Sequence, residues 1–421
     1  MVGYAARAWP PPAPVVLGFL ILLRRCHLPA STLLASLVLA GPSWAQAEAA
    51  RPDGAGGVLQ GVAGWLERNP RRLQQAFAGA GIYPSLGSFA QGTGPAPGLT
   101  FFQPRVAGGP FDLMVSTAAS FRGDSFEEVR IGRLPHAPGR APSRQHSLEA
   151  LTPAFAAGAA DRVFVYAELR RRDLESGELY DELGAATPYR LNEESLEVVG
   201  GYRLGQRWVA AVRAGTLASL ARVEADSGSP LAALREAGPN ERERFLRTAV
   251  SLAFDDRDDP RHATRGSFFE LTLARFAAER SGFGRLALDA RHFVALGSER
   301  NVLAFRACAT LDSAASAPFY LLDTLGGGER LRGYQAFRFR GPKLVALSAE
   351  YRRELARPLE GVAFYDAGRV WGGNGAMGTE GLLGSYGLGL RLKSSHGVLL
   401  RLEAARGAYG TRGIFKLGYA F

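Results

Sequence analysis

From residue 98 to its last residue, the chain is a series of segments in which apolar and polar side chains alternate. In 385–394, Leu388, Leu390 and Leu392 alternate with glycine, arginine and lysine. Successive side chains of a β-strand point to opposite faces, so each segment has one apolar and one polar face. Each has roughly ten residues, the length that a tilted strand needs to cross a bilayer. The pattern predicts an all-β fold, a transmembrane antiparallel β-barrel.

A soluble β-sandwich produces similar alternation, and the overall composition looks soluble. The mean hydropathy is −0.05 and 21% of the residues are charged. A transmembrane barrel has such values because half of each strand faces a polar lumen. The net charge of +10 comes from basic residues spread over many segments. Strand length and the repeated charges on one face therefore favour the barrel, and no nucleic-acid partner is expected.

The N-terminus predicts a secretory signal over residues 1–47. Arg24 and Arg25 precede an apolar core, Leu28–Ala40, and an A-x-A cleavage motif ends at Ala47. A second apolar run, Val15–Leu23, lies upstream. It indicates either a start codon placed too early or an unusually extended signal.

Residues 48–97 are expected to form a short periplasmic or plug segment that precedes a barrel over 98–421. Its apolar residues recur at helical spacing: Val58, Val62, Trp65, Leu66, Leu73 and Phe77. The end of the segment is rich in Gly and Pro. We interpret it as an amphipathic helix that acts as a plug or as an anchor on the membrane surface. The third interpretation is a periplasmic tail.

Two short motifs lie in the second half of the chain. The first, behind three consecutive glycines, is Leu331-Arg332-Gly333-Tyr334. The second, inside an alternating run, is Phe364-Tyr365-Asp366-Ala367-Gly368. Glu350 lies in the alternating segment between them. If the apolar face of each strand meets lipid, Glu350 and Asp366 face the inside of the barrel.

A third motif precedes these two. It consists of Asp255-Asp256-Arg257-Asp258-Asp259-Pro260, followed by Thr264-Arg265-Gly266. Its carboxylates are ligands of the kind that calcium prefers, but the EF-hand spacing is missing. We therefore interpret it as a charged turn that its own Arg257 and Arg261 stabilise.

Together the three motifs resemble the BamA/TamA outer-membrane superfamily, whose barrel is also called the bacterial surface antigen domain. In that family the arginine loop folds back into the barrel, and its arginine pairs with lumenal acids on the two following strands. The resemblance covers Gly98–Phe421 and implies that Arg332 pairs with Glu350 and Asp366. It also implies a location in the outer membrane of a Gram-negative bacterium.

The candidate strands are 98–106, 111–122, 125–135, 161–172, 189–204, 207–221, 244–256, 265–278, 282–296, 301–314, 343–355, 359–371, 385–394, 397–407 and 413–421. Bacterial barrels usually have an even number of strands with both ends in the periplasm. An extracellular Arg332 loop then needs an odd number of strands before it, so one is missing upstream. We predict sixteen strands and place the missing one at Leu148–Phe155, where Pro153 suits an edge or a bulge. The long loops near 136–160, 173–188, 222–243 and 315–342 are expected to be mostly extracellular.

The resemblance implies an outer-membrane assembly or translocation factor with a protein or lipid client. The best-known members carry periplasmic POTRA domains, and residues 48–97 are too few for one. The alternative is a passive channel or a structural barrel that handles no client. The expected partners are outer-membrane lipids, lipopolysaccharide and the barrel-assembly machinery that inserts the chain.

Catalytic and metal-binding patterns are missing from the sequence. It contains no Gly-x-Ser-x-Gly elbow, Walker loop, zinc motif or EF-hand, so neither an enzyme nor a cofactor or metal is expected. Cys308 is the only cysteine after the signal and is interpreted as a small packed side chain. The C-terminal aromatics Tyr419 and Phe421 resemble the targeting signal of outer-membrane barrels.

Overall fold

The computed structural model describes residues 81–87, 92, 95–135, 162–181, 184–224, 242–260, 262–279, 282–313, 317–356, 358–372, 377–378, 380–394 and 397–417. The predicted signal, the amphipathic segment, Leu148–Phe155 and the C-terminal aromatics Tyr419 and Phe421 lie outside the described residues.

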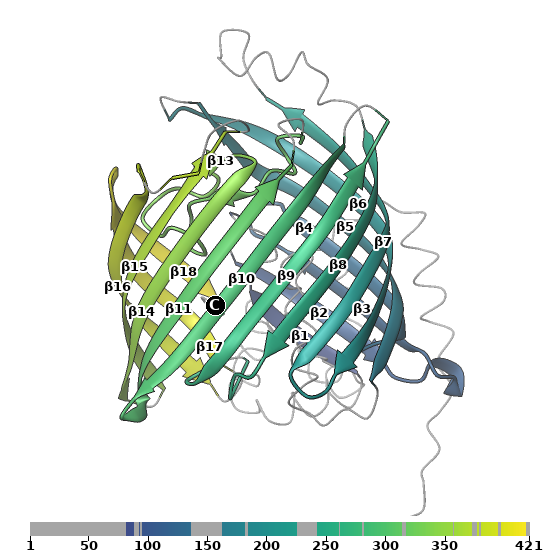
Figure 1. Cartoon of the computed structure of the whole chain (residues 1–421), viewed down its shortest axis with the longest axis horizontal. Helices are drawn as coiled ribbons and strands as arrows, with labels where there is room; N and C mark the ends of the chain where they lie inside the picture. Colours follow the sequence, from purple (N-terminus) through teal and green to yellow (C-terminus); the bar gives the residue numbers. More distant parts are fainter. Residues whose placement is uncertain are drawn as a thin grey trace, which may run out of the picture.

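The described chain forms one sixteen-stranded antiparallel sheet in which each strand pairs with the next along the sequence. The strands of its first half are β1 (Ile82–Gly87), β2 (Ala96–Gln103), β3 (Asp112–Ala119), β4 (Ser125–Arg133), β5 (Val163–Tyr180), β6 (Ala186–Leu204), β7 (Trp208–Val223) and β8 (Glu243–Asp255). Those of its second half are β9 (Gly266–Ala277), β10 (Gly282–Leu296), β11 (Ser298–Asp312), β14 (Lys343–Ala356), β15 (Leu359–Trp371), β16 (Leu383–Ser394), β17 (Gly397–Gly407) and β18 (Gly410–Leu417). The strands are tilted and lie side by side around a barrel (Figure 1).

Outside this sheet, two short strands, β12 (Thr324–Leu325) and β13 (Phe339–Arg340), pair with each other in the connection between β11 and β14. A single 3-10 turn, Val106–Gly108, lies between β2 and β3. We call the end of the barrel that carries the β11–β14 connection the loop end and the opposite end the turn end. No helix among the described residues is long and apolar enough to cross a membrane.

The two faces of the sheet differ as the alternation predicts. Leu388 and Val250, on the outer face, are 68% and 58% exposed, whereas Glu168, Arg247 and Arg401, on the inner face, are at most 1% exposed. Apolar side chains therefore meet lipid, and the inner charges are ion-paired. Cys308 is buried in β11 with a free thiol.

The predicted number of strands is confirmed, but the position of the missing one was wrong. The additional strand is β1, and β4 pairs directly with β5, which leaves no place in the sheet for a strand between them. The boundary at Gly98 is also too late, because the sheet starts at Ile82. The sequence of β1, IYPSLG, lacks apolar alternation, and Pro84 is tolerated because β1 is an edge of the hydrogen-bonded sheet.

Two of the predicted loops also need correction. Most of 173–188 belongs to β5 and β6, which meet at a turn after Tyr180. A β-bulge between Leu174 and Gly177 interrupts the alternation there. The connection between β4 and β5, predicted as an extracellular loop at 136–160, leaves the sheet at the turn end, because antiparallel strands alternate in direction.

Candidate functional site

Arg332 is buried against the inner face of β14 and β15, at 3% exposure. Its Nε and Nη2 donate to the two carboxylate oxygens of Asp366 at 2.8 and 2.7 Å, and its Nη1 donates to Glu350 Oε1 at 2.6 Å. Its backbone N–H donates to Asp366 as well, at 2.9 Å. The planar fork of the guanidinium thus serves two carboxylates at once.

The strand motif contributes all three of its characteristic residues to this contact. The guanidinium carbon of Arg332 lies 3.5 Å from the centre of the Phe364 ring, a cation–π contact. Asp366 accepts the hydrogen bonds. A Cβ on Gly368 would lie 3.1 Å from a methyl carbon of Leu325 and 2.8 Å from the Val345 carbonyl oxygen. The motif therefore supplies a stacking surface, an acceptor and the space for the loop.

The backbone of the loop motif fits tightly against the neighbouring strands. Gly333 has a positive φ of 92°, and a Cβ there would lie 2.9 Å from the Gly407 nitrogen in β17. Leu331, directly before Arg332, has a φ of 57° that non-glycine residues seldom adopt. Its side chain is 1% exposed and packs with Leu325, Tyr334, Leu344 and Ala346. This packing holds the strained backbone in place.

Tyr334 attaches the loop motif to β16 and to the turn between β17 and β18. Its hydroxyl donates to the Gly384 carbonyl at 3.0 Å and accepts from the Ala408 N–H at 3.1 Å. Its ring lies edge-on to Tyr409, with the ring centres 5.7 Å apart. The four-residue motif thus contacts β14, β15, β16 and the β17–β18 turn.

The ion network extends beyond the predicted residues. Arg391 donates to both oxygens of Glu350, at 3.0 and 2.8 Å, and to Glu403 at 2.8 Å. Arg401 donates to Glu403 at 2.7 Å. Arg352 adds a further hydrogen bond to Glu350 at 2.9 Å. The Ser348 hydroxyl accepts from Arg332 Nη2 at 3.0 Å and donates to Asp366 at 2.6 Å. We call these residues, with Arg332 and Asp366, the Arg332 network.

Sequence reasoning missed Arg391, Arg401 and Glu403, although a signal for them existed. Each lies on the polar face of a segment whose other face carries leucines. The register places Arg391 directly opposite Arg401, and this pairing could not be derived from either segment alone. Glu403 lies two residues further along the same face of β17 and compensates the two like charges.

The other end of the connection contacts a different part of the wall. Phe337 packs against Leu174 and Leu179 of β5, with a group that we call the loop-end cluster: Leu174, Leu179, Tyr189, Leu191, Ala221, Val223 and Phe337, with Tyr180, Phe319, Tyr320 and Ala336 beside it. Arg340 donates to the Tyr189 hydroxyl at 3.0 Å. The Tyr320 hydroxyl donates to Glu243 at 2.7 Å. The contacts from 319–340 therefore reach β5, β6, β7 and the start of β8.

The turn motif holds itself together at the turn end. Arg257 donates to both carboxylate oxygens of Asp255 at 2.9 Å, and Asp258 accepts from the backbone of Thr264 at 2.9 Å and of Arg265 at 3.2 Å. Arg257 also donates to the Pro260 carbonyl at 3.4 Å. A Cβ on Gly266 would lie 2.4 Å from the Asp256 carbonyl oxygen. Arg257 therefore acts as a brace for the turn, while Arg261 lies outside the described residues.

Burial by itself would raise the pKa of the Asp258 carboxyl. The hydrogen bonds from Thr264, Arg265 and Asp259 outweigh it, and the pKa lies below its ordinary value. In the described part of the chain, no group of three or more His, Cys, Asp or Glu side chains is placed to hold a metal ion.

The first and last strands of the sheet approach each other. Hydrogen-bonded pairing runs without a break from β1 to β18, but no ladder joins β18 to β1 among the described residues. We call this junction the seam. An edge strand has backbone N–H and C=O groups that a further strand can pair with.

Comparisons with known proteins agree with this architecture. Residues 163–410 match the model of the Omp85 superfamily domain. The fold is similar to BamA from Haemophilus ducreyi lacking POTRA domains 1-3, with a TM-score of 0.58, 14% identity, and coverage of 80% of this chain and 68% of that one. It is also similar to CdiB from Escherichia coli, with a TM-score of 0.51, 12% identity, and coverage of 80% of this chain and 60% of that one. No curated protein sequence matches the chain.

Proposed function

This chain belongs to the Omp85 superfamily and lies in the outer membrane, and we propose that it translocates or inserts a protein client there. In this proposal the loop end is extracellular, and the connection 313–342 folds inward and controls passage through the barrel.

The Arg332 network is the observation that carries the proposal. It attaches the connection to β14 and β15, while Phe337 and Arg340 attach it to β5 and β6. A segment held at both places lies across the lumen at the loop end. A translocation device needs such an obstacle to close the lumen when no client is present.

A client has two routes past this obstacle. Passage through the lumen requires release of Arg332, and breaking one buried ion pair costs about 3–5 kcal/mol. Passage along the seam requires only that β1 and β18 separate, because no ladder among the described residues joins them. A client strand can then pair with the free edge, as in β-augmentation. The difference in cost favours the seam for a client that enters the membrane.

Site-specific photocrosslinking in intact cells tests the proposal. Phe415 of β18 and Tyr386 of β16 both face lipid, at 55% and 59% exposure, but only Phe415 is on a strand of the seam. We expect a photoreactive phenylalanine at 415 to form adducts with other proteins and the matched probe at 386 to form few. Equal adduct patterns at both positions, together with steady conductance of the purified protein in planar bilayers, would establish the channel alternative instead.

A further inference from the structure

The connection between β11 and β14 contacts the turns on both sides of the seam at the loop end. β1 leads into the β1–β2 turn, where Gly92 has a φ of +81° and a Cβ would overlap the Phe337 ring. β18 starts after the β17–β18 turn, where the Tyr409 ring centre lies 5.6 Å from the guanidinium carbon of Arg338. Two consecutive residues of the connection therefore touch the turn that follows β1 and the turn that precedes β18.

Arg338 also joins the β17–β18 turn to a hairpin from another part of the wall. Its guanidinium carbon lies 5.3 Å from the ring centre of Tyr180, at the end of β5, and 5.3 Å from that of Phe339. Together with Tyr409, these rings form an aromatic cage around the cation. The Nη1 of Arg338 donates to the Asp181 carbonyl at 3.3 Å, which fixes the guanidinium beside the tip of the β5–β6 hairpin.

The β5–β6 hairpin reaches this site because it is longer than the strands beside it. β1 to β4 have 6 to 9 residues, whereas β5 has 18 and β6 has 19. β4 pairs with β5 only as far as Asp173, so Leu174–Tyr180 extends beyond β4 at the loop end. The charge of Arg412, in β18, acts on the Tyr180 hydroxyl. The tip of the hairpin therefore lies close to β18, although β1 to β4 separate β5 from the seam.

The backbone at Phe337 is strained, and packing on two sides holds it in place. Its φ of 62° is one that non-glycine residues seldom adopt. Its ring is buried in the loop-end cluster and lies against Gly92. Such strain persists only where the surroundings over-determine the conformation. Phe337 is thus held by β5 to β7 and by the β1–β2 turn at once.

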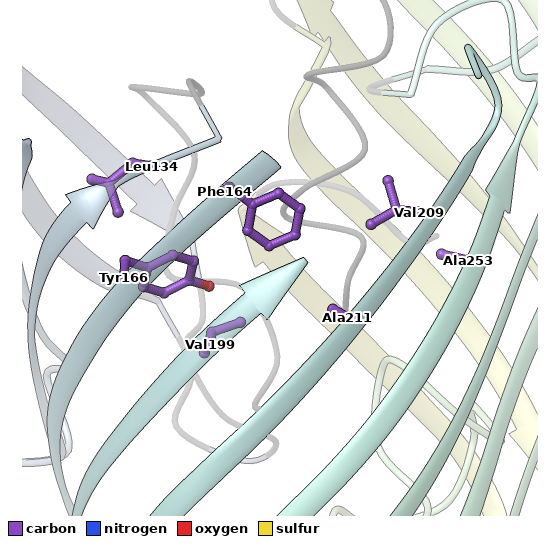
Figure 2. Packing of buried hydrophobic residues seen from close by; sticks show 7 residues of the cluster. All are labelled: Leu134, Phe164, Tyr166, Val199, Val209, Ala211 and Ala253. Carbon is purple, nitrogen blue, oxygen red and sulfur yellow. The ribbon is translucent and has the colours of Figure 1, made fainter. Parts of the chain in front are cut away.

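The same wall is packed differently at the turn end. Its apolar side chains there form a group that we call the turn-end cluster: Leu134, Phe164, Tyr166, Val199, Val209, Ala211 and Ala253, with Phe102 and Met114 packed against it (Figure 2). All of these residues come from wall strands or, for Leu134, from the residue after β4. The wall packs against itself at the turn end, whereas at the loop end residues of the connection complete the packing.

We propose that Phe337 and Arg338 clamp the seam at the loop end, so that β1 and β18 separate there only when one of these two contacts breaks. Separation moves the β1–β2 turn away from the β17–β18 turn. Phe337 is fixed against the first turn and Arg338 is caged by the second, so this movement pulls on both side chains. The connection then controls the seam as well as the lumen. The role of the clamp in client passage rests on the proposed function, whereas the clamp itself does not.

Pulsed EPR distances in the assembled protein test the clamp without a client. One spin label is attached at Pro97→Cys, across from Leu86 of β1, and the other at Thr411→Cys in β18, so that the pair spans the seam. Cys308→Ser removes the native thiol from both labelled proteins. We expect one narrow distance distribution when the clamp is intact.

The double variant Phe337→Ala/Arg338→Ala should lengthen the mean distance by about 5 Å, one strand spacing, or more. Arg338→Lys should have a smaller effect, because an ammonium keeps the charge but lacks the planar surface that stacks on rings. Phe164→Ala removes a buried ring from the turn-end cluster and should leave the distance unchanged. Heat-modifiable migration on gels verifies that each variant forms a barrel. An unchanged distance in the assembled double variant, or equal lengthening in Phe164→Ala, would overturn the proposal.

Photocrosslinking in intact cells separates the clamp from the proposed function. In Arg338→Ala, a photoreactive phenylalanine at 415 should form more adducts with other proteins than it does in the parent. A longer EPR distance with unchanged adducts would support the clamp and contradict client passage along the seam. An unchanged EPR distance would overturn the clamp whatever the adducts show.

Discussion

The connection between β11 and β14 contacts the barrel wall at two places of opposite chemistry. At β14 to β17 it is held by charge, since Arg332 lies between Glu350 and Asp366. At β5 to β7 it is held by packing, through Phe337 and its aromatic neighbours. An ion network requires fixed geometry, whereas an apolar cluster tolerates repacking. We infer that the charged contact determines the position of the loop and that the apolar contact strengthens its attachment to the wall.

The two contacts also differ in what remains after a mutation. Loss of Arg332 leaves Asp366 and Glu350, 2% and 1% exposed, with one cation fewer in a desolvated site. Loss of the Phe337 ring leaves a cavity that neighbouring side chains partly refill. Substitutions at the charged contact should therefore have larger effects on the loop than substitutions at the apolar contact.

The largest effect is expected from Arg332→Ala. Removal of one partner from a buried network costs about 3–5 kcal/mol. We expect this to destabilise the loop and not the barrel, because the strands keep their backbone hydrogen bonds. The loop should become sensitive to protease added outside intact cells, while heat-modifiable migration shows an assembled barrel. Arg332→Lys should restore protection only in part, because an ammonium lacks the fork that serves two carboxylates. A protease-resistant loop in the alanine variant would contradict this account.

A smaller effect is expected from Phe337→Ala. The side chain is 7% exposed, so its truncation costs about 3 kcal/mol, the lower end for a buried Phe, where the cluster relaxes into the cavity. Proteolysis in the same assay should quicken but stay slower than in Arg332→Ala. Phe337→Leu serves as the matched control and should differ little from the parent. If Phe337→Ala released the loop as completely as Arg332→Ala, packing rather than charge would determine the loop's position.

The smallest effect concerns the turn motif at the other end of the barrel. Because the pKa of Asp258 is lowered in the folded protein, its carboxylate stabilises the turn above the unfolded pKa of about 3.9. This contribution is lost as the pH falls through the lower, folded value. Solvent screening limits it to about 1 kcal/mol or less. Asp258→Asn should therefore lower the unfolding temperature slightly at pH 7 and not at strongly acidic pH; an equal loss at both would assign Asp258 an uncharged role.

The sequence predicted much of this architecture for identifiable reasons. Alternation located most of the strands and placed Glu350 and Asp366 on the inner face, and the resemblance selected Arg332 as their partner. Strand register was not accessible, so Arg391 and Arg401 were missed although both lie on predicted strands. Strand β1 was missed because its residues do not alternate.

A double-mutant cycle tests whether Arg332 and Asp366 share the hydrogen-bonded contact that positions the loop. The rate of external proteolysis of the loop is measured in Arg332→Ala, Asp366→Ala and the double variant, and Phe337→Ala is combined with Arg332→Ala as the independent pair. We predict that the double variant Arg332→Ala/Asp366→Ala is cleaved about as fast as Arg332→Ala alone, since both remove one contact. Combination with Phe337→Ala should be close to additive. Fully additive effects of Arg332→Ala and Asp366→Ala would show that the two side chains act separately and do not hold the loop through one shared contact.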